Sequence, residues 1–181
     1  MQVDHRAILQ FWFEEATAQQ HFSKDEKFDA EILRRFGDTH TAATHSELFE
    51  WRVTSEGRLA EIIVLDQFSR NLYRDSARAF ACDSMALVLA QEAVGNGADQ
   101  SLPQGQRLFL YMPYMHSESR RIHAVTLALF ESLGLAENLQ YELKHKAIID
   151  RFGRFPHRNA VLGRESTAEE LDFLSQPGSS F

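Results

Sequence analysis

The sequence predicts an all-α fold, and three observations lead to this prediction. Apolar residues recur every three or four positions along most of the chain, which is the period of an amphipathic helix. No stretch of four to eight residues alternates apolar and polar side chains between turn signals, as a half-buried strand would. The 181 residues include only 4 prolines and 9 glycines, which favours long regular elements. We expect about nine or ten helices in a single domain over 1–181, with 175–181 as a loose tail.

Capping residues, glycines and prolines divide the apolar periodicity into separate helices. In the first half of the chain we expect a helix over 4–14, a polar connector over 15–22 and a helix that begins at the capping box of Ser23 and Glu26 and ends at Gly37. A helix over 38–48 and an aromatic loop over 49–53 follow. We then expect a helix over 56–72 capped by Thr54 or Ser55, and a helix over 77–94 capped by Asp75 or Ser76. The several threonines within 38–48 lower helix propensity, so this element is the least regular of the set.

In the second half, proline and glycine mark most of the boundaries. We expect a helix from Pro103 through Met112 that Pro113 kinks or ends, followed by helices over 118–133, capped by Ser117, and over 136–152. A short helix over 157–162 follows Pro156. A last helix begins at a capping box formed by Ser166 with Glu169 or by Thr167 with Glu170. Gly134, Gly153 and Gly163 are expected to end their helices, and Gly37 is expected to end its own in a left-handed conformation.

Helices of these lengths, joined by short loops, pack as antiparallel pairs. Stacked pairs would form an α-solenoid-like right-handed superhelix, and the alternative is a compact bundle. A strict 34-residue repeat of the tetratricopeptide type is not visible in the sequence.

Charge and composition exclude several classes of partner. The formal charge is −7, which disfavours non-specific nucleic-acid binding, because such binding needs a basic surface. No apolar run approaches the ~18 residues that span a bilayer. The N-terminus lacks the layout of a signal peptide, and the single cysteine, Cys82, allows no internal disulfide. We therefore expect a cytoplasmic protein with no nucleic-acid or membrane partner.

Residues 147–164 form the densest stretch of specific residue types. Arg151, Arg154, Arg158 and Arg164 lie here, with Asp150 as the only acidic residue. A local basic patch on an acidic protein suits a small anionic ligand. The alternative is that these arginines pair with acidic helices elsewhere in the chain.

Part of this stretch repeats a sequence pattern, which we call the echo, from an earlier predicted helix. The pattern apolar-Asp-x-Phe-x-Arg occurs at 65–70 and again at 149–154, which places Asp66 four residues before Arg70 and Asp150 four before Arg154. On a helix each aspartate reaches its arginine along one face and fixes the guanidinium. A fixed guanidinium binds carboxylate or phosphate well, and the alternative is a pair of buried structural salt bridges.

Three histidines are the weak candidates for catalysis. His157 follows Pro156 at a predicted helix start, where backbone N–H groups and the helix dipole favour anions; the alternative is that it ties down its loop. His116 and His145 titrate near neutral pH and are candidate general bases, with a structural role as the alternative.

Other chemistries lack their sequence signals. His40 and His45 are five residues apart rather than four, and no zincin glutamate accompanies them, so we expect no metal. The sequence has no Gly-x-Ser-x-Gly elbow, no phosphate-cradling Gly-Lys-Ser/Thr loop and no Cys/His dyad pattern. We expect no cofactor, and the sequence specifies neither a reaction nor an oligomeric state.

Three motifs together resemble a bacterial family, domain of unknown function 924. They are residues 63–74 around Leu65-Asp66-Gln67-Phe68, residues 111–118 with Tyr111-Met112-Pro113-Tyr114, and residues 151–164 with Arg158-Asn159 and Leu162-Gly163-Arg164. The resemblance runs from Phe11-Trp12-Phe13 to Glu169-Glu170, with Ser69 where proline is expected. It implies an all-helical, tetratricopeptide-like superhelix and no particular reaction.

Two functional hypotheses follow from these patterns. The first is binding of a small phosphate or carboxylate ligand at an arginine and histidine cluster, for which the expected ligand-binding residues are Asp66, Arg70, Arg74, Asp150, Arg151, Arg154, Arg158 and Arg164. The second is a tetratricopeptide-like scaffold that binds a peptide or protein partner on its concave face, an expectation that rests on fold analogy alone.

Overall fold

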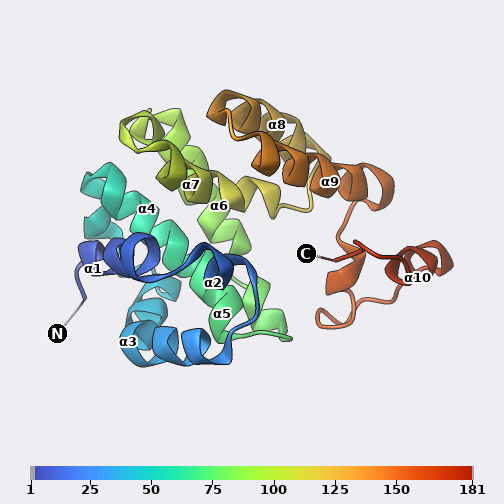
Figure 1. Cartoon of the computed structure of the whole chain (residues 1–181), viewed down its shortest axis with the longest axis horizontal. Helices are drawn as coiled ribbons and strands as arrows, with labels where there is room; N and C mark the ends of the chain where they lie inside the picture. The colour runs from blue at the N-terminus through green and yellow to red at the C-terminus, as the bar shows by residue number, and fades with distance from the viewer. Residues whose placement is uncertain (1–2, 181) are drawn as a thin grey trace. The chain divides into compact units, whose positions relative to one another are not determined.

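The computed structural model of the chain describes residues 3–180, and within this range the chain forms helices and no strand. The predicted all-α class is therefore confirmed. The α-helices are α1 (His5–Gln10), α2 (Ala18–Phe22), α3 (Glu26–Thr44), α4 (Ser55–Ile63), α5 (Ser69–Leu72), α6 (Asp83–Gly95), α7 (Gln104–Met115), α8 (Arg120–Leu133), α9 (Ala136–Phe152) and α10 (Ala168–Leu174) (Figure 1).

Shorter helical segments connect or extend these helices. Two are π-helical, η1 (Phe11–Glu15) and η3 (Val64–Phe68), and four are 3₁₀ helices, η2 (Phe49–Val53), η4 (Ala77–Phe80), η5 (Ala98–Ser101) and η6 (Pro156–Arg158). Within residues 3–180, no helix is both long and apolar enough to cross a membrane.

The chain divides into two compact units. The first unit comprises the chain through Arg74 together with residues 78–113, and the second comprises residues 75–77 together with the chain from Tyr114 onward. In the first unit α4 contacts α1 and α6, and α3 contacts α5. In the second unit α8 and α9 pack side by side, and α10 contacts η6 (Figure 1). The single domain expected over 1–181 is a prediction that this division does not decide.

The core of the first unit is built around one continuous helical stretch formed by α4, η3 and α5. Residues 61–69 are all buried, so this stretch is covered on every side, as expected for a central helix. Aromatic rings pack against it: Phe36 lies 5.4 Å from Phe68, and Trp12 lies 5.7 Å from Phe68 and 5.5 Å from Phe109, measured between ring centroids. The phenylalanines at helical spacing are thus mainly packing residues.

The core of the second unit lies between α8, α9 and the segment after α9. Ile148, Ile149 and Phe155 are buried together, and Phe152 and Phe173 pack against them. This core places Phe155, in the dense stretch at 147–164, at the centre of the unit.

Several predicted helix ends are confirmed. The helix predicted over 136–152 is α9, and Gly134 and Gly153 end α8 and α9 with φ of +75° and +72°. These left-handed conformations are the reason that glycine occupies the two positions. Gly163 has φ of +65°, but it follows turns and ends no helix, because the helix predicted over 157–162 is only the 3₁₀ turn η6. Thr54 caps α4 through the backbone N–H of Gly57.

The predicted capping box of the last helix is also present. Thr167 and Glu170 form it at the start of α10. Beyond α10, Ser179 is buried and donates a hydrogen bond to the Leu174 carbonyl, so this part of the expected loose tail is held. Phe181 lies outside the described residues.

The boundaries of α3 were predicted wrongly. Asp25 caps this helix by accepting hydrogen bonds from the N–H groups of Lys27 and Phe28, whereas Ser23 donates to the Gln19 carbonyl. The helix then continues through Gly37 to Thr44 and includes most of the element predicted separately over 38–48. A glycine in a helix interior costs about 1 kcal/mol, which the buried face from Phe28 to Ala43 outweighs.

Two connectors also contain helix. The polar segment over 15–22 includes α2, because Thr17 and Gln20 form a capping box. The aromatic loop over 49–53 is the 3₁₀ helix η2.

Three helix starts or stops are displaced. The helix predicted over 77–94 is interrupted, and α6 begins only at Asp83, because Asp75 adopts a left-handed φ of +57° and 77–80 forms a 3₁₀ turn. Ser119, not Ser117, caps α8. α7 runs through Pro113 to Met115, so this proline does not end it.

Candidate functional site

Arg70 is held by two aspartates within the first unit. Its Nη1 and Nη2 donate to the carboxylate of Asp83 at 3.0 and 3.1 Å. Its Nη1 also lies 3.2 Å from Oδ1 of Asp66, whose side chain is fully buried. The predicted Asp66–Arg70 pair is therefore present, and its guanidinium fork is already directed at Asp83.

Arg74 is paired in the same way. Its Nε and Nη2 donate to the two carboxylate oxygens of Asp29 at 2.5 and 2.9 Å, and Asn71 donates to Oδ1 of Asp29 at 2.8 Å. Asp29 lies on α3, so Arg74 joins that helix to the end of α5.

The predicted pair of Asp150 with Arg154 is wrong. The left-handed Gly153 ends α9 one residue before Arg154, so the two residues are no longer one helical turn apart. Arg154 instead donates from Nε and Nη2 to Glu170 at 2.7 and 2.8 Å, and Asp150 accepts from Lys146 at 2.5 Å. The echo between 65–70 and 149–154 is thus one of sequence and not of structural role, since Asp66 is buried and Asp150 exposed.

Arg164 is the fourth arginine with a fixed carboxylate. Its Nη1 and Nη2 donate to Glu118 at 2.6 and 2.9 Å, and its Nε donates to Oδ1 of Asn159 at 2.9 Å. Burial opposes ionisation of Glu118, yet hydrogen bonds from Arg164 and from the backbone N–H of Phe155 outweigh it and lower the pKa of this carboxyl. The alternative interpretation of the basic stretch, in which its arginines pair with acidic residues elsewhere in the chain, is confirmed for Arg154 and Arg164.

Histidines and one arginine surround a single buried ring in the second unit. The Phe155 ring centroid lies 5.6 Å from that of His145, 5.6 Å from that of His157 and 6.2 Å from that of His123. The guanidinium carbon of Arg158 lies over the same ring, 4.6 Å from its centroid. We call Phe155, His123, His145, His157 and Arg158 the Phe155 cluster; the charge of His116 also acts on His145.

His145 is a neutral imidazole within this cluster. It is buried, and its Nδ1 donates to the Tyr141 carbonyl at 2.8 Å, which leaves the lone pair on Nε2. Burial, together with the charges of His116, His123 and Arg158, lowers the pKa of His145 to about 3, against the opposing effect of the Tyr141 hydrogen bond. At neutral pH this side chain is therefore uncharged.

A second histidine in the cluster shares a proton with a glutamate. His123 and Glu142 are both fully buried, and Nδ1 of His123 lies 2.8 Å from Oε1 of Glu142. Nε2 of His123 lies 2.8 Å from the Ser117 carbonyl, to which it donates. Burial raises the pKa of Glu142, and the neighbouring His123 opposes this. One proton therefore lies between the two side chains, while Oε2 of Glu142 is buried with no hydrogen-bond partner in the described chain.

The remaining predicted site residues are placed differently. Arg151 is about half exposed, donates to the exposed Glu169 and lies over the Phe152 ring. The helix start expected at His157 is the three-residue η6, followed by turns, so it lacks the dipole of a longer helix. Within residues 3–180, no group of three His, Cys, Asp or Glu side chains is arranged to hold a metal ion.

Some residues of the cluster were not singled out from the sequence. His123 and Glu142 lie 19 residues apart on two helices, and no local pattern joins them. Phe155 was one aromatic among 14 phenylalanines. One signal was available: the second unit has four histidines, and three of them lie around Phe155.

Comparison with known proteins agrees with the family resemblance of the three sequence motifs at 63–74, 111–118 and 151–164. The family model described as "Bacterial protein of unknown function (DUF924)" matches residues 8–178. The solved structure of ATU0120, a protein of unknown function from Agrobacterium tumefaciens, is 39% identical, with a TM-score of 0.89 over 94% of this chain and 96% of that one. No curated protein matches the chain. The chain therefore belongs to the bacterial family of unknown function DUF924.

Proposed function

We propose that the protein binds a small anionic molecule, a phosphate or carboxylate, at the Phe155 cluster, with Arg158 as the main charged contact. The observation that carries the proposal is the grouping of one guanidinium and several imidazoles around one ring. A guanidinium with little exposure to water interacts with an anion more strongly than a surface arginine, because it is screened less. Arg158 is 6% exposed.

The acidic groups of this region have partners of their own. Glu118 accepts from Arg164 and from the backbone of Phe155, and Glu142 pairs with His123. Arg158 nonetheless acts on its surroundings at a distance, because its charge lowers the pKa of both Glu118 and His145. The field at the cluster therefore favours an anion.

Small hydroxy acids and inorganic phosphate are the simplest ligands of this charge class. No reaction is assigned to the cluster.

The proposal is tested by calorimetric titration with inorganic phosphate and with a panel of small hydroxy acids at low salt. Arg158→Met removes the charge but keeps an apolar stem over Phe155. Arg151→Met is the matched control, because both arginines lie 4.6 Å from a phenylalanine ring centroid. We expect saturable binding that Arg158→Met weakens at least about tenfold and Arg151→Met leaves unchanged. Absence of binding across the panel, or equal losses in the two variants, contradicts the proposal.

The tetratricopeptide-like superhelix and its scaffold function remain the alternative prediction. A scaffold would retain a peptide or protein partner with the second unit intact and without any small anion. A pull-down that recovers a stoichiometric partner, together with a titration that finds no anion, would favour the scaffold over the ligand site.

A further inference from the structure

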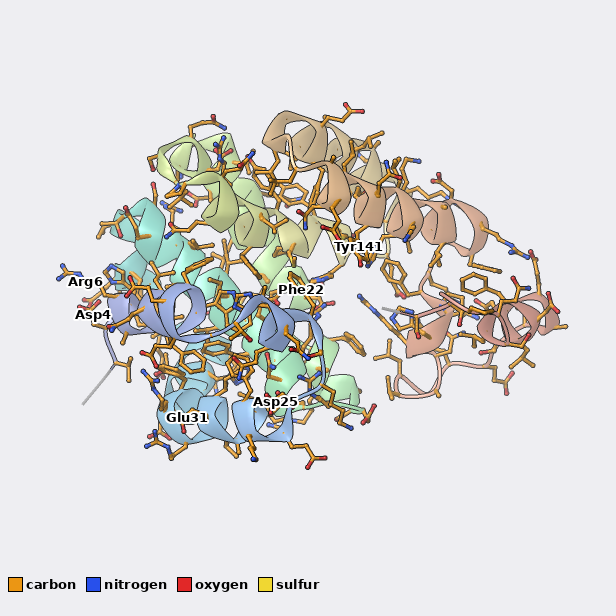
Figure 2. The ribbon with its side chains drawn as sticks, in the orientation of Figure 1. Asp4, Arg6, Phe22, Asp25, Glu31 and Tyr141 are labelled. Carbon is orange, nitrogen blue, oxygen red and sulfur yellow. The ribbon has the colours of Figure 1, made fainter. Side chains whose placement is uncertain are left out.

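The outer face of α8 carries little charge for a surface helix. Residues 122–130 include no Asp, Glu, Lys or Arg, yet Ala124, Val125 and Ala128 are exposed, Val125 to 46%. A surface helix normally places charged side chains on the face opposite its core. α8 packs beside α9, and side chains project from α8 on the side turned away from α9 (Figure 2). The centre of this outer face therefore has no cover among residues 3–180.

The two ends of the same face carry charges that the helix itself disfavours. Arg121 is exposed in the first turn of α8, and Glu131 is exposed in its last turn. The dipole of a helix favours acidic residues at its start and basic residues at its end, so both positions reverse the stabilising arrangement. Neither side chain forms an ion pair or a side-chain hydrogen bond with any other residue that the structure describes.

Arg120 shows how such a reversed charge is compensated inside the chain. It also lies in the first turn of α8, and its Nε and Nη2 donate to the carbonyls of Ile149 and Asp150 at 3.2 and 3.1 Å. These carbonyls belong to the last turn of α9, so a basic side chain at the start of one helix lies against the negative end of its antiparallel neighbour. Arg121, one position along, has no such acceptor within 3–180.

We propose that the outer face of α8 is a dimer interface, on which the α8 of a second copy packs antiparallel about a twofold axis level with Thr126. Under this symmetry, residues equally far from Thr126 in opposite directions face each other. Ala124 faces Ala128 of the second copy, and each lies two residues from Thr126. Arg121 faces Glu131 of the second copy, and each lies five residues from Thr126. Each reversed charge then meets both an opposite charge and the opposite end of a helix dipole.

The size of the central side chains permits this contact. Two helix axes approach to about 8 Å only where the facing side chains are small, as Ala124 and Ala128 are. Arg121 and Glu131 are about 15 Å apart along the axis, so they lie at the rim of the contact. One helix from each copy makes a small interface, for which we expect a dissociation constant of ~10–100 μM. His123 lies on the opposite, buried side of α8, so the interface is separate from the Phe155 cluster.

Sedimentation equilibrium of the full chain measures this association. We expect a mass that rises with protein concentration from 20.8 kDa toward twice that value. A mass that stays at 20.8 kDa up to a concentration of ~500 μM overturns the inference.

Two alanine substitutions locate the interface. Ala128→Arg places a long charged side chain at the centre of the contact, and we expect it to weaken the dimer at least about tenfold. Ala147→Arg is the matched control, because Ala147 is also an exposed alanine within a helix of the second unit, and the change in net charge is the same. Equal weakening by both variants, or none by Ala128→Arg, means that α8 does not form the interface.

Charge reversal tests the antiparallel register. Arg121→Glu and Glu131→Arg each create two repulsive pairs across the twofold axis, and we expect each alone to weaken the dimer about tenfold. An equimolar mixture of the two variants restores both attractive pairs in the heterodimer, so its dissociation constant should return to within about threefold of the wild-type value. Both changes agree with the helix dipole, so circular dichroism should show α8 intact in each. A mixture that associates no better than the separate variants shows that residues 121 and 131 do not face each other, and the proposed interface is then rejected.

Discussion

At the scale of single residues, Glu170 links three parts of the second unit. Its carboxylate accepts from two nitrogens of Arg154, from the backbone N–H of Thr167 and from Asn159. The hydrogen bonds from Arg154, followed by that from Thr167, lower the pKa of Glu170 to about 2 against the effect of burial. This side chain therefore stays ionised over the whole physiological range and depends on its donors.

Replacement of Arg154 should destabilise the protein. Arg154→Ala leaves the buried carboxylate of Glu170 without its strongest donors, and we expect the free energy of unfolding to fall by ~3 kcal/mol at pH 7. Arg151→Ala, which removes an exposed pair with Glu169, should change it by less than ~1 kcal/mol. Urea titration of both variants measures the difference, and equal losses would contradict the structural role of Arg154.

Stability should also depend on pH through His145. Its pKa in the folded chain, about 3, lies below the value of about 6.5 in an unfolded chain. The unfolded state therefore binds this proton first, so stability is complete above pH ~6.5 and declines as pH falls toward 3. His145→Asn keeps a donor for the Tyr141 carbonyl and removes the titration. We expect its loss of stability between pH 7 and 4 to be smaller than that of the wild type, measured by chemical denaturation at each pH; parallel curves would refute this.

The sequence predicted which charged residues gather in one stretch, but it did not predict the side chains with which most of them pair. The basic stretch at 147–164 and the Asp66–Arg70 pair followed from spacing along the chain. The partners of Arg154 and Arg164 lie 16 and 46 residues away, at Glu170 and Glu118, and only the tertiary fold brings them together. The single pair predicted wrongly, Asp150 with Arg154, failed because Gly153 interrupts the helix that the spacing assumed.

At the scale of elements, two glycines at helix ends were predicted correctly, whereas several N-caps and one helix-interior glycine were not. Gly134 and Gly153 end α8 and α9 as predicted, because a positive φ has a strong preference for glycine. Gly37, predicted to end its helix, lies inside α3 with an ordinary helical backbone. A glycine thus ends a helix at one position and lies inside a helix at another. Which of the two occurs depends on tertiary packing, which the local sequence pattern does not contain.

Gly57 and Gly105, both inside helices, allow the effect of packing on a glycine substitution to be tested. A Cβ added at Gly57 in α4 would lie 2.0 Å from the carbonyl oxygen of Trp51, so α4 and η2 approach closely there. We expect Gly57→Ala to lower the free energy of unfolding by ~3 kcal/mol. Gly105→Ala in α7 meets no atom within 4 Å and should stabilise the protein by ~0.5–1 kcal/mol. Thermal denaturation of both variants compares them, and a neutral Gly57→Ala would contradict the close approach.

At the scale of the whole molecule, each of the two units contains its own core. The aromatic residues around Phe68 all belong to the first unit, and those around Phe155 to the second. The all-α class followed from periodicity alone. The division into units did not, because α7 crosses the boundary at Pro113 without a break in helix, and no composition change marks it.

This division predicts that the first unit folds without most of the second. A fragment of residues 1–113 retains Trp12, Phe36, Phe68 and Phe109 with their contacts, and we expect it to be helical and to unfold cooperatively. Circular dichroism and calorimetric melting of the fragment test this. A gradual, non-cooperative melt would mean that this core needs residues beyond 113.

The two π-helical segments have a consequence for the length of the chain. A π turn contains one residue more than the α-helical turn that it replaces, as the hydrogen bond from the Ala16 N–H to the Phe11 carbonyl five residues earlier illustrates. A deletion of one residue within 64–68 would convert η3 to regular α-helix and leave Arg70 facing Asp83. The same deletion inside α6 would turn every later residue of that helix by about 100°. Single-residue deletions should therefore be tolerated better at η1 and η3 than in the regular helices beside them.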